Sequence, residues 1–197
     1  CMMVILSSML LLPMYLQGGL VLTAFASGLV LLPGGILNGF MSPVTGRLFD
    51  KYGPKWLVIP GFVIVTVVLW FFSNVTTTST AVLIIILHTC LMIGISMIMM
   101  PAQTNGLNQL PREFYPDGTA IMNTLQQMAG AIGTAVAVSI MAAGQHDYMS
   151  TVKNPADPAV IPQALTAGVQ HAFVFAMIVA IIGLIGAFFM KRVKVDH

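Results

Sequence analysis

The run Gly46-Arg47-Leu48-Phe49-Asp50-Lys51-Tyr52-Gly53-Pro54-Lys55 holds four of the fourteen Asp, Glu, Lys and Arg side chains in this chain of 197 residues. Long apolar stretches flank the run on both sides, and residues 1–46 contain no Asp, Glu, Lys or Arg. A helix needs about 20 mostly apolar residues to cross a bilayer, so the stretch before the run has room for two spans. The run therefore predicts a tight, charged hairpin at a membrane surface.

The composition of the whole chain points the same way. Hydrophobic residues make up 57% and charged residues 7%, against roughly 25% charged residues in typical soluble domains. The net charge of +2 is too small to indicate a nucleic-acid partner. Cys1 and Cys90 show no metal-binding or disulfide spacing, and no nucleophile–base cluster suggests an enzyme. We predict an all-α integral membrane protein with no metal site and no nucleic-acid partner.

Apolar runs broken by polar, Gly or Pro residues predict six transmembrane helices. They are expected at residues 2–16, 23–49, 56–72, 80–107, 118–143 and 167–190. Gln17-Gly18-Gly19 is expected to form a turn, residues 145–166 the longest loop, and residues 191–197 a basic tail. The opening Cys-Met-Met-Val lacks the features of a cleavable signal, so we expect a fragment of a longer protein.

The basic residues predict the orientation of these spans. Alternate connections lie on the same side of a membrane, and one side collects seven of the eight Lys and Arg residues. Cytoplasmic loops carry the excess of Lys and Arg. We therefore expect the charged hairpin and both ends of the segment in the cytoplasm, and the loop at 145–166 outside. The seven residues are Arg47, Lys51, Lys55, Arg112, Lys191, Arg192 and Lys194, against Lys153 alone on the other side.

Polar side chains separate the spans into two groups. The spans at 56–72 and 167–190 carry almost none, so they are expected to face lipid. The other four carry hydroxyl, amide or imidazole groups, which are costly in hydrocarbon unless they meet partners or water. These four spans are expected to face one another or an aqueous cavity. The candidates for a substrate or proton pathway are His88, Met92, Ser96, Gln103, Asn123, Gln126 and Gln127.

His88 and Met92 can each be interpreted in two ways, as part of a transport pathway or as ordinary helix packing. His88 lies about nine residues into its span, roughly 13 Å along the helix and close to the midplane. Such a group indicates proton coupling or substrate contact, or else a neutral imidazole bonded to a neighbouring helix. Met92 and its neighbouring methionines suit a promiscuous apolar pocket, or ordinary filling of gaps between helices. A pocket of Met, amide and hydroxyl groups without fixed charge would suit lipophilic compounds of varied shape.

Small residues recur four apart on two spans. Such spacing lets helix backbones approach closely. Plain helix packing is the simpler interpretation, and a hinge is the alternative. The residues are Gly35 and Gly39 on the second span, and Ala129, Gly133 and Ala137 on the fifth.

The charged run also resembles a known signature. Its pattern Gly46-x-Leu48-x-Asp50-Lys51-x-Gly53-x-Lys55 is similar to the G-x-L-x-D-R-x-G-R/K-R/K motif of the major facilitator superfamily, departing at Lys51 and Pro54. Residues 12–17 and 26–34 resemble the first two helices of the C-terminal half of fourteen-span drug:proton antiporters. Residues 117–133 resemble the penultimate helix of that half. The resemblance covers nearly the whole chain in order.

This resemblance implies the C-terminal six-helix half of a multidrug efflux transporter in a bacterial plasma membrane. Two halves would rock around a central site, with a proton gradient as energy source and no cofactor. The partners would be the bilayer, an N-terminal half of six to eight helices and a small lipophilic substrate. Asp50 would latch the halves together, supported by Gly46, Arg47 and Gly53. No Asp or Glu lies mid-membrane, so a coupling carboxylate would belong to the other half.

Two rival hypotheses remain on the sequence alone. The first is a major facilitator transporter of another substrate, such as a metabolite or a sugar. The second is a membrane-embedded assembly subunit that transports nothing. On physical grounds alone, the charged run is equally compatible with a hairpin that only sets the topology.

Overall fold

The computed structural model describes residues 1–152 and 157–190. These residues form helices and connecting segments and no β-strand. Six helices are long and apolar enough to cross a membrane, so the predicted all-α fold with six spanning helices is confirmed. The helices are α1 (Met2–Met14) with a π-helical extension η1 (Tyr15–Gly19), α2 (Ala24–Tyr52), α3 (Lys55–Phe72), α4 (Ala81–Leu107), a 3-10 turn η2 (Arg112–Phe114), α5 (Tyr115–Thr151) and α6 (Val160–Phe188).

Three predicted boundaries are wrong. Residues 17–19 continue the first helix as a π-helical turn instead of ending it. The helix α2 continues through most of the charged run and ends at Tyr52. Only residues 152–159 separate α5 from α6, so most of the expected loop at 145–166 is helical. The predicted boundaries differ because polar residues mark where a span leaves the hydrocarbon core, and a helix can continue beyond that point. The predicted tail at 191–197 and Lys153 lie outside the described residues.

Helix α5 is likewise longer than the hydrocarbon core is thick. Its 37 residues extend about 55 Å at 1.5 Å per residue, well beyond the roughly 30 Å of a hydrocarbon core. Its last turns join α6 through a hydrogen bond in which the Tyr148 hydroxyl donates to Gln163 Oε1 at 2.7 Å. The two helices thus form a paired hairpin past the apolar region.

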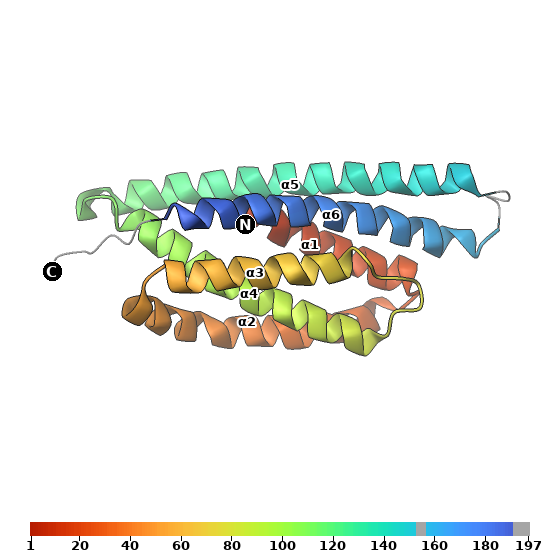
Figure 1. The fold of residues 1–197 in the computed structure, drawn as a ribbon, viewed down its shortest axis with the longest axis horizontal. Helices are drawn as coiled ribbons and strands as arrows, with labels where there is room; N and C mark the ends of the chain where they lie inside the picture. The colour runs from red at the N-terminus through yellow and green to blue at the C-terminus, as the bar shows by residue number, and fades with distance from the viewer. Residues whose placement is uncertain (153–156, 191–197) are drawn as a thin grey trace.

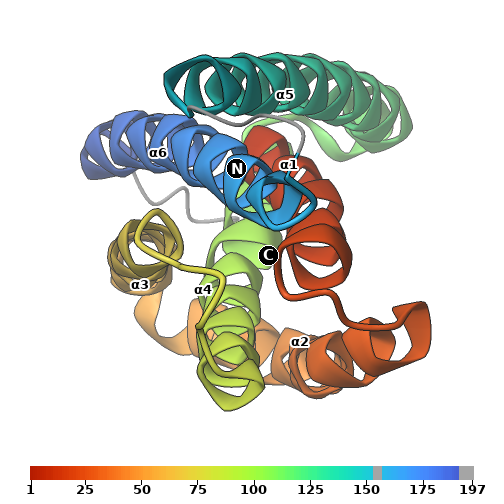
Figure 2. The ribbon, with the colours of Figure 1, turned by 90° about the vertical axis from the view of Figure 1, so that its right-hand side faces the viewer.

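The helices pack as two groups of three. Helix α4 packs against α2 and α3, and α1 packs against α5 and α6. The contact between α3 and α6 joins the groups. Figure 2, which looks along the bundle, shows α1 and α4 in the middle, α5 and α2 at opposite edges, and α6 and α3 together on one side. In Figure 1 the helices run roughly parallel along the long axis.

Glycines allow the closest of these contacts. A Cβ added at Gly61 of α3 would lie 2.9 Å from the carbonyl oxygen of Gly94, and one at Gly94 of α4 would lie 3.0 Å from that of Gly61. Gly168 of α6 would in the same way meet the backbone of Met141 on α5. Close backbone approach is a frequent way for membrane helices to associate. The two groups of helices are therefore held by backbone packing as well as by side chains.

The helices α3 and α6 were expected to face lipid, and each exposes apolar side chains but also packs against other helices. One face of α3 is buried against α4 and α6, whereas Trp56, Val63, Val67 and Trp70 are exposed. Phe72 stacks on Phe173 of α6, with ring centroids 5.0 Å apart. An entirely apolar sequence does not reveal which face packs, because lipid and a protein interior are equally apolar.

Candidate functional site

The charged run forms one end of the bundle, which we call the motif end. Helix α2 ends there at a turn of two residues, Gly53 and Pro54. Gly53 has φ 82° and ψ 174°, a region that essentially only glycine occupies. Its N–H donates to the carbonyl oxygen of Phe49 at 2.8 Å. The predicted hairpin is therefore a tight turn between two helices, and the glycine is required by the backbone.

Gly53→Ala is expected to lower the free energy of unfolding by roughly 1–3 kcal/mol, because a Cβ is strained at these angles. Thermal unfolding of the purified intact protein measures the loss. Gly46→Ala is the matched control, because its Cβ would lie 3.6 Å from Met100 Cε, an ordinary contact. Equal melting temperatures for the two variants would contradict the assignment.

Lys55, the last residue of the run, joins the turn to a distant part of the chain. Its Nζ donates to the carbonyl oxygen of Phe188, the final residue of α6, at 3.0 Å. The last carbonyls of a helix lack intrahelical partners and carry partial negative charge, so a cation is favoured there. The sequence does not reveal this role, because 133 residues separate the two partners.

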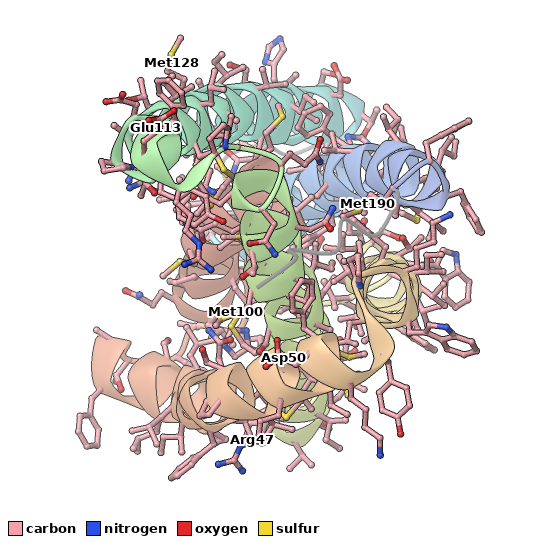
Figure 3. The ribbon with its side chains drawn as sticks, turned by 90° about the vertical axis from the view of Figure 1, so that its left-hand side faces the viewer. Arg47, Asp50, Met100, Glu113, Met128 and Met190 are labelled. Carbon is pink, nitrogen blue, oxygen red and sulfur yellow. The ribbon has the colours of Figure 1, made fainter. Side chains whose placement is uncertain are left out.

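Arg47 and Asp50 extend from different edges of α2. Figure 3 shows Asp50 on the edge that faces α4, near Met100, while Arg47 points away from the bundle. Glu113 and Met190 lie at the same end of the bundle (Figure 3). The motif end thus gathers the connections that the orientation rule assigned to one side.

A pocket of about 310 Å³ lies among α1, α2 and α4, and we call it the His88 pocket. His88 and Met92, two of the pathway candidates, line it, and His88 is only 8% exposed. Apolar side chains form most of the surface, and the charged residues of the described chain are absent from its lining. The remaining polar groups come from Ser8 of α1 and Asn38 of α2.

The imidazole of His88 is held by α2. Its ring lies against Gly34, where an added Cβ would be 2.5 Å from Cδ2 and 2.9 Å from Nε2. Its Nδ1 is buried and has no hydrogen-bond partner among the described residues. Gly34 therefore fixes the position of the ring against α2, and a role of His88 in coupling or substrate contact stays a prediction.

A second pocket of about 320 Å³ lies among α1, α4 and α5. We call it the glutamine pocket, because Gln103 of α4 and Gln126 of α5 both line it. Met99, Met122 and Ala129 also line it. The linings of both pockets come only from α1, α2, α4 and α5, the four helices that polarity had selected.

The remaining candidates lie elsewhere. Ser96 is buried in α4, and Asn123 and Gln127 are exposed on α5; none of the three lines either pocket. Gly35 and Gly39 have no atom within 4 Å of an added Cβ, so their assignment to helix packing is wrong within this chain. Gly35 instead lines the His88 pocket.

On the fifth helix, Gly133 and Ala137 pack inside the bundle, whereas Ala129 lines the glutamine pocket. A Cβ at Gly133 would lie 2.6 Å from Cα of Met3 in α1. Ala137 is fully buried. Gly34, whose contact with His88 fixes the ring, was missed, because two adjacent glycines give no sign of which one faces a neighbour. Gly130, which meets Leu6 of α1, was also missed.

Most of this chain is similar in sequence to a known protein family and to several of its members. Residues 1–134 match the sequence profile of the Major Facilitator Superfamily. Lincomycin resistance protein LmrB of Listeria monocytogenes serovar 1/2a is 62% identical over 192 residues, which cover 98% of this chain and 41% of that protein. The uncharacterized MFS-type transporter YcnB of Bacillus subtilis (strain 168) is 38% identical over 181 residues, covering 92% of this chain and 37% of that protein.

A more distant relative carries a related description. The multidrug resistance protein B homolog of Mycobacterium tuberculosis is 26% identical over 218 residues, covering 96% of this chain and 40% of that protein. The chain spans about two fifths of the length of these curated relatives. Its six apolar helices and the match over residues 1–134 agree with the resemblance of the charged run, and the chain belongs to the major facilitator superfamily.

Proposed function

We propose that this chain is the C-terminal half of a proton-driven exporter of lipophilic antibiotics and related compounds. The observation that carries the proposal is the 62% identity to a lincomycin resistance protein across almost the whole chain. The two pockets support it, because their linings combine apolar, amide and hydroxyl groups without a fixed charge. Such surfaces accept ligands of varied shape.

Transport would follow alternating access between this bundle and an N-terminal half of six to eight helices. The helices α1, α2, α4 and α5 would face that half, since they line the pockets, and α3 and α6 would contact lipid. A proton gradient would supply the energy without a cofactor. The described residues place no Asp or Glu in the middle of a helix that lines a pocket. A coupling carboxylate would therefore come from the N-terminal half.

We assign the motif end to the cytoplasm of a bacterial cell. Arg47, Lys51, Lys55 and Arg112 lie at that end, whereas the described part of the opposite end contains Asp147 and Asp157 and neither Lys nor Arg. This distribution agrees with the excess of basic residues in cytoplasmic loops. Basic side chains there also bind anionic lipid headgroups.

Transport assays on the intact protein that contains this chain test the proposal. In inside-out vesicles, an imposed proton gradient is expected to drive uptake of ethidium and of radiolabelled lincomycin, and a protonophore is expected to abolish it. Uptake of neither compound, in vesicles where the protein is present and folded, would reject drug export. Proton-driven movement of sugars or organic acids alone would support the rival transporter. Transport of ethidium without a gradient would reject proton coupling.

A further inference from the structure

Helix α3 exposes an apolar stripe with a tryptophan at each end. The exposed residues of this stripe are Trp56, Pro60, Val63, Val67 and Trp70. Their spacing of four and three residues places them along one face of the helix. Trp56 and Trp70 are the two tryptophans of the chain, and they are 75% and 53% exposed. Tryptophan is enriched at both membrane–water interfaces, because its ring is apolar and its N–H is polar. The stripe therefore has the pattern of a face that crosses lipid between two interfaces.

Helix α6 carries a second stripe beside the first. The two helices pack together, since Phe72 of α3 stacks on Phe173 of α6, and Figure 2 shows them on one side of the bundle. The exposed residues of α6 repeat the spacing of four and three residues. They are Val174, Ile178, Ile181, Ile185 and Phe188. We call these five residues and the five of the α3 stripe the α3–α6 face.

Polar groups set the apolar length of α3. Lys55 begins the helix, and its Nζ donates to the carbonyl oxygen of Phe188 at 3.0 Å. At the other end, Ser73 Oγ and Asn74 Nδ2 donate to the carbonyl oxygen of Trp70 at 2.7 and 2.8 Å. The 18 residues of α3 extend about 27 Å, and its two tryptophans lie about 21 Å apart, at 1.5 Å per residue. Both lengths are shorter than the roughly 30 Å of an average hydrocarbon core.

A phospholipid bilayer is the partner that fits this face. Lys51 and Lys55 lie just before Trp56 in the sequence, at the end where anionic lipid headgroups favour basic side chains. A span that is shorter than the hydrocarbon core thins the bilayer around it, or draws its flanking residues toward the hydrocarbon. Lys55 opposes the second outcome, because a charge is costly in hydrocarbon and the hydrogen bond with α6 holds its side chain at the helix end.

We propose that the α3–α6 face binds a phospholipid bilayer that is locally thinned to a hydrocarbon thickness of about 25 Å. Trp56 and Trp70 lie at the two borders of this thinned hydrocarbon and anchor α3 there. This inference rests on the proposed function only in assigning α3 and α6 to lipid, and it adds the bilayer thickness that the protein prefers.

The depth of single tryptophans in the bilayer tests the placement of the face. Bromine atoms on lipid chains quench tryptophan fluorescence, and the probes are phosphatidylcholines brominated either near the glycerol or near the chain ends. Differences between the purified intact protein and its Trp56→Phe and Trp70→Phe variants isolate each native tryptophan. Val63 is exposed and lies midway between them in the sequence. Val63→Trp, made in the variant that lacks both tryptophans, is therefore the matched probe of the bilayer centre.

We expect Trp56 and Trp70 to be quenched more strongly by bromines near the glycerol, and Val63→Trp more strongly by bromines near the chain ends. The same order of quenching at all three positions would overturn the placement. No quenching by either lipid would show that protein covers the face, and it would also overturn the proposal. Monodisperse elution of each variant in size-exclusion chromatography establishes that the variants are folded.

The melting temperature of the intact protein in bilayers of different thickness tests the preference. The lipids are dipalmitoleoyl, dioleoyl and dierucoyl phosphatidylcholine, in order of increasing thickness. The melting temperature is expected to be highest in dipalmitoleoyl lipid and lower by about 5 °C or more in dierucoyl lipid. The double variant Trp56→Phe and Trp70→Phe lacks the polar N–H groups and is expected to show a smaller difference. Equal melting temperatures in the three lipids, or an undiminished difference in the double variant, would overturn the proposal.

The outcome is separable from that of the proposed function. If the intact protein exports ethidium while its tryptophans are not quenched, the lipid face fails and export stands. If the quenching and melting results are as described while no compound is exported, the lipid face stands and the exporter proposal fails.

Discussion

Gly94→Leu is expected to prevent the intact protein from folding into a stable bundle. A Cβ at Gly94 would lie 2.8 Å from Val65 Cγ2 and 3.0 Å from the carbonyl oxygen of Gly61. The backbone at Gly61 cannot yield as the end of a flexible side chain could. Overpacking by single methylene groups already costs about 1–3 kcal/mol, and a leucine adds four carbon atoms. The helices α3 and α4 would therefore separate.

Fluorescence-detected size-exclusion chromatography of detergent-extracted protein measures this effect. The monodisperse peak of Gly94→Leu is expected to fall to roughly a tenth of the parent yield or less, a severity typical of disrupted cores. Gly28→Leu is the control, because Gly28 on α2 has no atom within 4 Å of an added Cβ. A normal monodisperse peak for Gly94→Leu would show that α3 and α4 do not meet through this glycine.

Asp50→Asn is expected to reduce proton-driven drug export by about tenfold or more while leaving membrane insertion intact. In the proposed mechanism, the carboxylate latches this half to the N-terminal half. Losing one partner of a close charge pair costs about 2–5 kcal/mol, which is enough to shift the balance between two transport states. Asparagine has nearly the same shape as aspartate, and Asp50 is exposed at the end of α2, so we expect the variant to insert into the membrane.

Initial rates of ethidium export, normalised to the amount of protein in the membrane, test this prediction. Asp50→Glu retains the charge and is expected to recover part of the activity. An unchanged export rate in Asp50→Asn would remove the latch and leave the charged run as a marker of topology. Loss of the protein from the membrane would instead assign Asp50 to folding.

Much of the fold was predictable because the spanning helices follow directly from hydrophobicity. Residues 1–46 lack charged side chains, and their two predicted spans are both found. The helix ends were less predictable. The stretch after residue 143 is polar, yet α5 continues to Thr151. Polarity indicates where the hydrocarbon ends, whereas the helix continues as long as its backbone hydrogen bonds are formed.

The candidate site was predictable in its chemistry but not in its geometry. His88 and Gln126 were selected as polar groups in apolar surroundings, and each lines a pocket. Asn123 and Gln127 have the same chemistry, but both are exposed on α5. Gly34 and Gly35 differ only in direction, about 100° around the helix axis. The direction of each residue depends on how α2 is rotated against α4, and an almost uniformly apolar helix carries no pattern that fixes this rotation.

The two-residue turn at Gly53 couples the position of α2 to that of α3. Helix α2 is continuous over 29 residues, about 43 Å at 1.5 Å per residue. Only Gly53 and Pro54 separate its end from α3. The side chain of Lys55, at the start of α3, forms a hydrogen bond with the end of α6. We therefore expect a displacement of α2 at the motif end to be felt at the end of α6 as well.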